Sequence, residues 1–237
     1  MVSMYARASR VFGRNCLFFA GYAAVPTALD TFFQGSVGAF ASIVLFSLLA
    51  FYSYRIVSSG VTLSLKESLT GRPKGPLGGS MFPFLWRYWV FGFLIFILLA
   101  VFAAVAFMAA AGRIALTPED IALPSFAAAS LAGLIPLSLI GTVLPASALF
   151  EDASVKRAFA IGRRSFWRTS ARLLVGGGLV SVVSLMLTPG AFAILPEGFL
   201  MLFAAYLSSA YSIVLTATAL CMAYEKGQPV SMAEVFS

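Results

Sequence analysis

Six apolar segments, separated by short polar connections, make up most of the chain. A helix needs about 20 apolar residues to cross the roughly 30 Å hydrocarbon core of a bilayer. The segments that reach or approach this length are 16–33, 37–56, 89–111, 126–150, 173–195 and 199–224. The last four contain no ionisable residue. The pattern predicts an all-α, polytopic membrane protein, with six transmembrane helices in a single domain of residues 1–237.

The first segment is the weakest of the six, because it contains Pro26 and carries Asp30 near its far end. Three arginines precede it, as they would in a signal peptide. However, Pro26 and Leu29 disturb any cleavage site of the small-x-small type. We therefore expect this segment to be retained as a transmembrane helix.

Positive charge is distributed unevenly between the connections. With the N-terminus inside, the inner side holds all of the 16 Lys and Arg residues except Arg113. Cytoplasmic connections carry such an excess, and the three tryptophans fall at the inner boundaries, where aromatic rings prefer the headgroup region. We expect both termini in the cytoplasm, with 57–88 and 151–172 as cytoplasmic connections.

A similar short phrase follows each even-numbered segment. In each phrase a serine (Ser64, Ser154 or Ser231) precedes a large apolar residue by five positions. Serine at a helix N-cap accepts a hydrogen bond from the first turn, and Ser231 with Glu234 has the spacing of a capping box. The pattern predicts three helical hairpins, each followed by a short cytoplasmic interfacial helix. Because serine caps are common, chance similarity is the alternative.

The middle phrase is the strongest candidate for a binding surface. Val155, Phe159, Gly162 and Phe166 recur at helical spacing, which is typical of a helix lying in the membrane surface. The candidate contacts for anionic lipid headgroups or a protein partner are Lys156, Arg157, Arg163, Arg164, Arg168 and Arg172. The alternative is that these cations only set the topology.

Composition narrows the chemistry further. Of the residues, 60% are hydrophobic and 11% are charged, and the net charge of +7 lies in membrane-flanking connections rather than in a nucleic-acid-binding module. The absence of histidine, with two cysteines only, argues against metal sites, cofactors and nucleophile pairs. We expect Cys16 and Cys221 to be unpaired packing residues. An enzyme acting on lipid would depend on Asp30, Glu151 and Asp152, and Asp152 is better explained as a helix cap.

Prolines and small residues mark special points inside the predicted spans. Pro136 and Pro145 lie in the fourth segment, and Pro189 lies in the fifth. Proline removes a backbone hydrogen bond, so we expect kinks that serve packing, with a broken transporter-type helix as the alternative. The glycines 176–178 open the fifth span, and we expect Ser208, Ser209 and Ser212 of the sixth to face them across a close helix contact.

The segment from Leu144 to Arg168 carries a family resemblance. A proline-containing helix ends in an acidic residue, Glu151, and is followed by the aromatic-basic sequence Phe166-Trp167-Arg168. This segment resembles bacterial six-helix inner-membrane proteins of unknown function, related to the membrane domain of glycerophosphodiester phosphodiesterases. The resemblance implies a six-helix domain in the bacterial inner membrane. The catalytic domain of those enzymes uses histidines and clustered carboxylates, which this chain lacks, so no activity is implied.

The expected function follows from these features. We expect a non-enzymatic inner-membrane protein, acting as a scaffold, an accessory subunit or a lipid-interacting module. Its expected partners are another membrane protein or a second copy of the same chain. The alternative is a small transporter or channel-like protein for an apolar or amphipathic solute.

Overall fold

The structure is a computed structural model that describes residues 2–32, 36–63, 80–110, 132–151, 153–180 and 198–227. Within these ranges the chain is helical and forms no strand, which confirms the all-α expectation there. The elements are α1 (Val2–Arg14), α2 (Cys16–Phe32), α3 (Ser36–Ser59), α5 (Phe82–Ala110), α7 (Val143–Ala148), α8 (Val155–Leu173), the π-helical η2 (Leu174–Gly178) and α10 (Gly198–Gly227). Residues 132–140 form a further helical stretch.

Three of the described helices are long and apolar enough to cross a membrane. These stretches are Ala41–Ser59, Phe82–Phe102 and Phe199–Gly227. The helix Cys16–Phe32 is also apolar but shorter. In length and composition these are helices of a membrane protein, as the hydrophobic pattern predicts.

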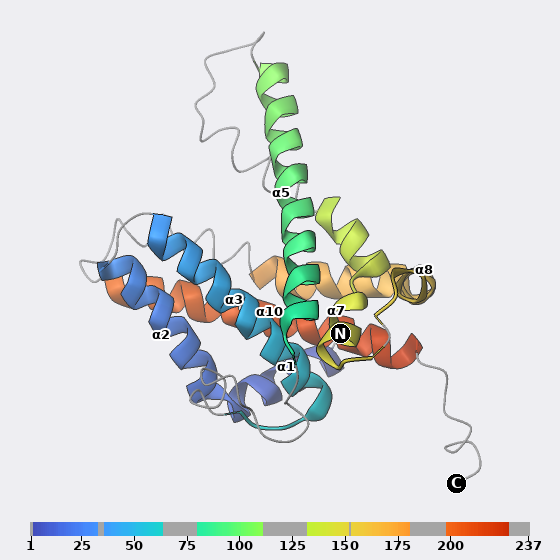
Figure 1. Cartoon of the computed structure of the whole chain (residues 1–237), viewed down its shortest axis with the longest axis horizontal. Helices are drawn as coiled ribbons and strands as arrows, with labels where there is room; N and C mark the ends of the chain where they lie inside the picture. Colours follow the sequence, from blue (N-terminus) through green and yellow to red (C-terminus); the bar gives the residue numbers. More distant parts are fainter. Residues whose placement is uncertain are drawn as a thin grey trace.

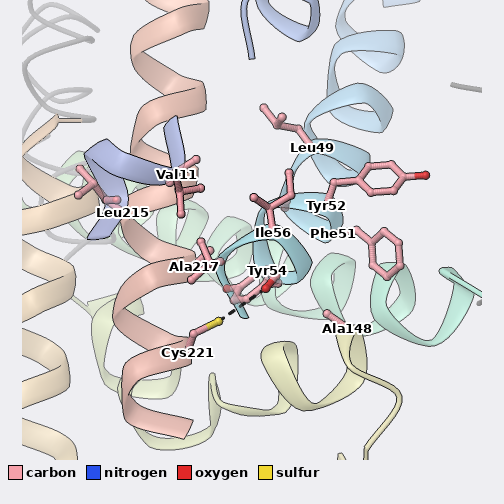
Figure 2. Packing of buried hydrophobic residues seen from close by; sticks show 14 of the residues in the cluster. Val11, Leu49, Phe51, Tyr52, Tyr54, Ile56, Ala148, Leu215, Ala217 and Cys221 are labelled. Carbon is pink, nitrogen blue, oxygen red and sulfur yellow. Dashed lines mark hydrogen bonds between the residues drawn. The ribbon is translucent and has the colours of Figure 1, made fainter. Parts of the chain in front are cut away.

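Helix α10 is the element on which the others pack. It contacts α1, α2, α3, α7, α8 and η2, and Figure 1 shows α2 and α3 (blue) lying across it (orange to red). Its buried side chains are mostly small, as at Ala210, Ala217 and Cys221, which allows neighbouring helices to approach closely. In Figure 2, Tyr54 of α3 lies against Cys221, whose thiol approaches the Tyr54 carbonyl oxygen at 3.9 Å. The core of the described residues therefore forms around α10.

Helix α5 is attached at one end only. It contacts α3 and α7, and the rest of it projects away from the other helices (Figure 1). The attachment uses Phe84, which is fully buried, and Trp89, whose indole N–H donates to the Ser47 hydroxyl at 2.9 Å. The helix begins at Phe82 rather than at residue 89. Phe84 packs its first turn against the rings of Phe51 and Tyr54 in α3.

The predicted fourth span, 126–150, is not one continuous helix where the structure describes it. Helical residues 132–140 give way to a turn at 141–142, and α7 follows. Pro145 has no N–H with which to bond the carbonyl of Gly141, and the Leu144 N–H donates to that oxygen instead, at 3.0 Å. The kink expected near this proline is therefore a full break. At the other end, Phe150 adopts a left-handed φ of 59°, and the Glu151 N–H bonds back to the Ala146 carbonyl oxygen at 3.0 Å.

Helix α1 was not predicted from the sequence. Its buried side chains Met4, Ala8 and Val11 face α10 and its neighbours. Their spacing of four and three residues is the amphipathic signal that would have revealed the helix. Asn15 ends α1, and its side-chain oxygen accepts a hydrogen bond from the Leu63 N–H at 2.9 Å. The arginine-rich start of the chain is therefore a packed helix in this structure, and α2 begins directly after it.

The glycine-rich opening of the fifth span is a π-helical turn, η2. The Ser212 hydroxyl of α10 donates to the Gly177 carbonyl oxygen at 2.8 Å, which confirms the expected contact for Ser212. The Ser209 hydroxyl instead donates to the Ala205 carbonyl oxygen of its own helix. Tyr5 of α1 donates to the Val175 carbonyl oxygen at 2.6 Å. Side chains of two other helices thus satisfy carbonyls in a turn where the α-helical bonding pattern is interrupted. Segment 181–197, and the phrases that begin at Ser64 and Ser231, lie outside the described residues.

Candidate functional site

Helix α8 carries the predicted basic residues and begins where its cap predicts. Ser154 has an extended backbone, with φ −71° and ψ 136°, and its hydroxyl accepts a hydrogen bond from the Arg157 N–H at 3.3 Å. This confirms the Ser154 cap; Asp152 lies outside the described residues. Gly162 lies against the carbonyl group of Leu139, and a Cβ at residue 162 would clash with it. The cap and this close contact fix where α8 starts and how it rests on the bundle.

The face of α8 that packs on the protein differs from the predicted apolar face. Val155 and Phe159 are 59% and 46% exposed, whereas Ala158 and Ile161 are buried. Gly162 is buried and belongs to the predicted face as well. The close contact of Gly162 with Leu139 sets which side of α8 faces the protein, so Val155 and Phe159 are turned outward. They are thereby left free to meet a membrane surface.

A basic groove lies between α8 and the end of α10, which are neighbours in Figure 1. Its volume is about 1040 Å³. The charged residues that line it are Arg157, Arg163, Arg164, Arg168, Arg172 and Lys226. None of the described residues that line it is acidic. The structure thus brings together all the predicted contact residues except Lys156, which does not line the groove.

Lys226 is the groove cation that the sequence analysis did not single out. It belongs to the last turn of α10, and only the packing of α10 on α8 brings it to the groove. Gly227 permits this packing, since a Cβ there would come within 2.6 Å of the Ile161 side chain. The signal in the sequence was the position of Lys226 at the predicted inner end of the sixth span, on the same side of the membrane as the arginines of α8.

Four arginines form a stripe along α8. Arg157, Arg164, Arg168 and Arg172 are separated by seven, four and four residues, which places them on one side of a helix. Ile161, which contacts the end of α10, lies on the same side. The last three arginines follow one another by about 6 Å along the axis at each step. The stripe therefore presents several guanidinium groups to a single anion or to an extended one.

Arg172 is the most unusual member of this stripe. As a residue it is 8% exposed, and no ion pair joins it to another described residue. Its guanidinium nitrogens are not among the buried atoms of the described residues that lack a partner, so its charged end reaches the groove. Burial lowers the pKa of Arg172, and the positive charge of Arg168 lowers it further. Guanidinium remains protonated at physiological pH even so. The repulsion between Arg168 and Arg172 is unfavourable, and a bound anion would offset it.

The acidic residues near this end of α10 are engaged elsewhere. Both carboxylate oxygens of Glu225 accept hydrogen bonds from Arg7 of α1, at 2.6 and 2.7 Å. This bonding raises the pKa of Arg7, more than burial lowers it. Glu151 accepts a hydrogen bond from the Tyr224 hydroxyl. Neither carboxylate lines the groove.

A smaller basic hollow of about 260 Å³ lies beside α1. It is lined by Arg7, Arg10 and Arg14, together with the end of α3. Arg7 is held by Glu225 and by the Val57 carbonyl oxygen, at 2.8 Å. This hollow therefore has one cation fixed by the protein itself, which distinguishes it from the groove on α8.

Arg55 lies at the inner end of the second predicted span and is 3% exposed. Its guanidinium carbon lies 4.6 Å from the ring centroid of Phe150 and 5.4 Å from that of Phe51. Such contacts contribute about 1 kcal/mol or more when desolvated. They help to hold Phe150 in its left-handed conformation, and so fix the chain between α7 and α8.

The two described carboxylates considered for catalysis, Asp30 and Glu151, do not meet. Asp30 of α2 accepts a hydrogen bond from Tyr206, whereas Glu151 bonds to Tyr224. These tyrosines are separated by 18 residues of α10, or about 27 Å along its axis. In the described ranges, no group of three His, Cys, Asp or Glu residues is placed to hold a metal ion. The geometry thus gives no support to paired-carboxylate chemistry.

The two cysteines are both free, as expected, but they differ in environment. Cys221 is fully buried in the core, which confirms its packing role. Cys16 is exposed, so the expected packing role is wrong for this residue. It lies at the start of α2.

Comparison of the chain with known protein families, with characterised proteins and with solved structures finds no match. The resemblance to the membrane domain of glycerophosphodiester phosphodiesterases therefore stays a prediction, and the site itself carries the functional argument.

Proposed function

We propose that this chain is a non-enzymatic, six-span protein of the bacterial inner membrane, and that its basic groove binds anionic lipid headgroups at the cytoplasmic face. The observation that carries the proposal is the groove on α8, which is lined by six cations and by no acidic residue among those described. The protein would then act as a lipid-interacting scaffold or accessory subunit.

The packing supports the proposed topology. Arg7 of α1 bonds both to the Val57 carbonyl near the end of α3 and to Glu225 near the end of α10. The N-terminal helix, the end of the second predicted span and the end of the sixth therefore meet at one end of the bundle. A six-span chain with both termini inside would place these three ends on the same side of the membrane. Three contacts between consecutive elements, α2 with α3, α5 with α7 and η2 with α10, also suit an arrangement of hairpins.

The surroundings of the groove favour a lipid over a soluble anion. Val155, Phe159 and Trp167 are exposed on α8, and Trp167 is 83% exposed. Aromatic and aliphatic side chains beside arginines are typical of helices that lie in a membrane surface. Each cation near an anionic surface contributes about 1 kcal/mol of attraction.

The test is a count of bound lipids on the purified full-length protein. Native mass spectrometry of detergent micelles titrated with phosphatidylglycerol would compare wild type with Arg164→Gln/Arg168→Gln. The control, Lys156→Gln/Arg10→Gln, removes the same charge outside the groove. We expect a several-fold loss of bound lipid in the groove variant alone, since attraction of about 1 kcal/mol per cation corresponds to several-fold binding. Equal losses in the two variants would overturn the groove as the site.

The transporter alternative is favoured by two observations, the break in the fourth predicted span and the π-helical start of the fifth. Discontinuous helices of this kind form binding sites in transporters. A solute pathway would require Ser212 and Gly177, which are hydrogen-bonded here, to separate. Solute uptake by proteoliposomes, compared with Ser212→Ala proteoliposomes, tests this alternative, and an identical uptake would reject this pathway.

A further inference from the structure

We infer that the groove on α8 selects a terminal phosphate, that is, a phosphomonoester or diphosphate group, with Arg168 and Arg172 as its principal ligands. The inference rests on the proposed function, because it names the class of headgroup that the same groove would hold. It goes beyond anionic lipid in general, since phosphodiester headgroups carry a single charge on each phosphate.

The first argument is the charge that must be balanced. The groove concentrates five guanidinium groups and one ammonium group without an acidic lining residue among those described. One phosphodiester supplies a single negative charge to this cluster. A terminal phosphate supplies nearly two charges at neutral pH, as well as three strong acceptor oxygens. A dianionic group therefore suits the cluster better than a monoanionic one.

The second argument is the fork geometry of arginine. Arg168 and Arg172 are one helical turn apart on the groove side of α8. Each guanidinium can donate two parallel hydrogen bonds to oxygens of one phosphate. Three unsubstituted oxygens can accept from both arginines at once, whereas a diester has only two. Arg164 and Lys226 remain for the second phosphate of a diphosphate.

The third argument is the burial of Arg172. This side chain is 8% exposed, and its neighbours Thr169 and Leu173 are 1% and 2% exposed. Arg172 lines the groove at a corner where these neighbouring side chains are covered. A phosphodiester carries a carbon substituent on both sides, but a terminal phosphate carries only one. The corner therefore admits the end of a headgroup and disfavours its middle.

Two sources could supply this group, a membrane lipid or a soluble phosphate compound. The exposed Val155, Phe159 and Trp167 on the same helix suit a lipid tail at the membrane surface. The shared chemistry is the terminal phosphate, and the experiment distinguishes the sources.

The experiment uses the full-length protein in nanodiscs of zwitterionic phosphatidylcholine. Equal total negative charge is supplied either as phosphatidic acid, a phosphomonoester, or as phosphatidylglycerol, a phosphodiester. The lipids retained by the protein are then counted. A third arm adds inorganic diphosphate or glycerol 3-phosphate without anionic lipid. The variants are Arg172→Gln and Arg168→Gln, with Lys156→Gln, on the same helix but outside the groove, as the matched control.

We expect about a 10-fold preference for phosphatidic acid at matched charge, because the second ionisation of a terminal phosphate near pH 6 doubles its charge. Both groove variants should lose the preference, and Lys156→Gln should keep it. Arg172→Lys should restore only part of it, because the charge is retained without the fork. The preference should also fall several-fold from about pH 7.5 to about pH 5, as the phosphate gains a proton. The groove holds no histidine or carboxylate among its described lining residues, so this titration belongs to the ligand.

Each outcome decides something. Equal retention of the two lipids, dependent on Arg164 and Arg168, would overturn the terminal-phosphate inference and leave the proposed lipid groove standing. Retention independent of every groove arginine would overturn both. Binding of diphosphate or glycerol 3-phosphate as tight as that of the lipid, and lost in Arg172→Gln, would support the phosphate chemistry and assign its source to solution. If Arg172→Gln fails to fold, the exposed Arg168→Gln decides in the same way.

Discussion

Two arginines on amphipathic helices that pack against α10 differ in almost every respect. Arg7 of α1 is held by both carboxylate oxygens of Glu225 and by a backbone carbonyl, and its side chain is 31% exposed. Arg172 of α8 is 8% exposed and has no partner among the described residues. The pKa of Arg7 is raised by its hydrogen bonds to Glu225, whereas that of Arg172 is lowered by burial.

The difference indicates that Arg7 stabilises the fold, whereas Arg172 is available to bind a ligand. Arg7 joins the ends of three helices and contributes its attraction in the folded state. Arg172 is repelled by Arg168 in the folded state until an anion binds. An arginine held beside other cations, in a groove without an acidic lining residue among those described, is suited to bind an anion. The predictions below test whether the two arginines behave in these opposite ways.

The largest expected effect comes from the contact that positions the Arg172 helix. Gly162→Ala places a Cβ against the backbone carbonyl of Leu139, so α8 must shift. We expect a loss of about 3 kcal/mol or more in the free energy of unfolding, at the upper end of the cost of overpacking. Thermal unfolding in detergent micelles measures it. Gly13→Ala in α1, where nothing lies within 4 Å, is the control and should be neutral or slightly stabilising. A neutral Gly162→Ala would contradict the packing of α8.

The next effect is stabilisation by ligand. Saturating phosphatidic acid, at about 100 times its dissociation constant, should stabilise the wild type by about 2.7 kcal/mol. Arg172→Gln should lose most of this gain, whereas Arg7→Gln should retain it, because Arg7 is not in the groove. The shift in melting temperature with added lipid measures both. Equal gains in the two variants would remove the distinction between the arginines.

A smaller effect is expected from the paired arginine alone. Arg7→Gln should destabilise the protein by about 1 kcal/mol without ligand, since a partly exposed ion pair with good geometry contributes at this scale. The folded-state pKa of Arg7 is raised, so its contribution is present at all pH values below the usual arginine range and is lost only in strong alkali. Unfolding between pH 6 and 9 should therefore show no Arg7-dependent trend. The charge-swapped pair Arg7→Glu/Glu225→Arg, which keeps opposite charges at the two sites, should recover part of the loss.

The smallest effect has the opposite sign. Without ligand, Arg172→Gln should be neutral, or should stabilise the protein by about 0.5 kcal/mol, because it removes the repulsion between Arg168 and Arg172, which are four residues apart on the helix. Chemical unfolding of the lipid-free protein measures it, and Arg172→Lys, which retains the charge, should not stabilise. A loss of more than about 1 kcal/mol in Arg172→Gln would mean that Arg172 stabilises the fold as Arg7 does.

Hydrophobic length predicts the long helices, and capping chemistry predicts the start of α8, because both signals act between neighbouring residues. The apolar stretches became the long helices α3, α5 and α10, and Ser154 caps α8 as its position predicts. Where a local signal was overlooked, as in the spacing of Met4, Ala8 and Val11, the helix α1 was missed. The break before Pro145 was expected only as a kink, because the loss of one backbone bond does not reveal how the freed carbonyl of Gly141 will be satisfied.

The sequence by itself determined the helical class, the candidate spans and the charge asymmetry between the connections, since these depend on composition and on neighbours a few residues apart. Only the tertiary structure decided which side of α8 is buried and which arginines keep their charge unpaired. The reason is that these outcomes depend on contacts between residues distant in the chain. Gly162 fits against Leu139, Glu225 is taken by Arg7, and Arg172 is thereby left facing the groove without a carboxylate.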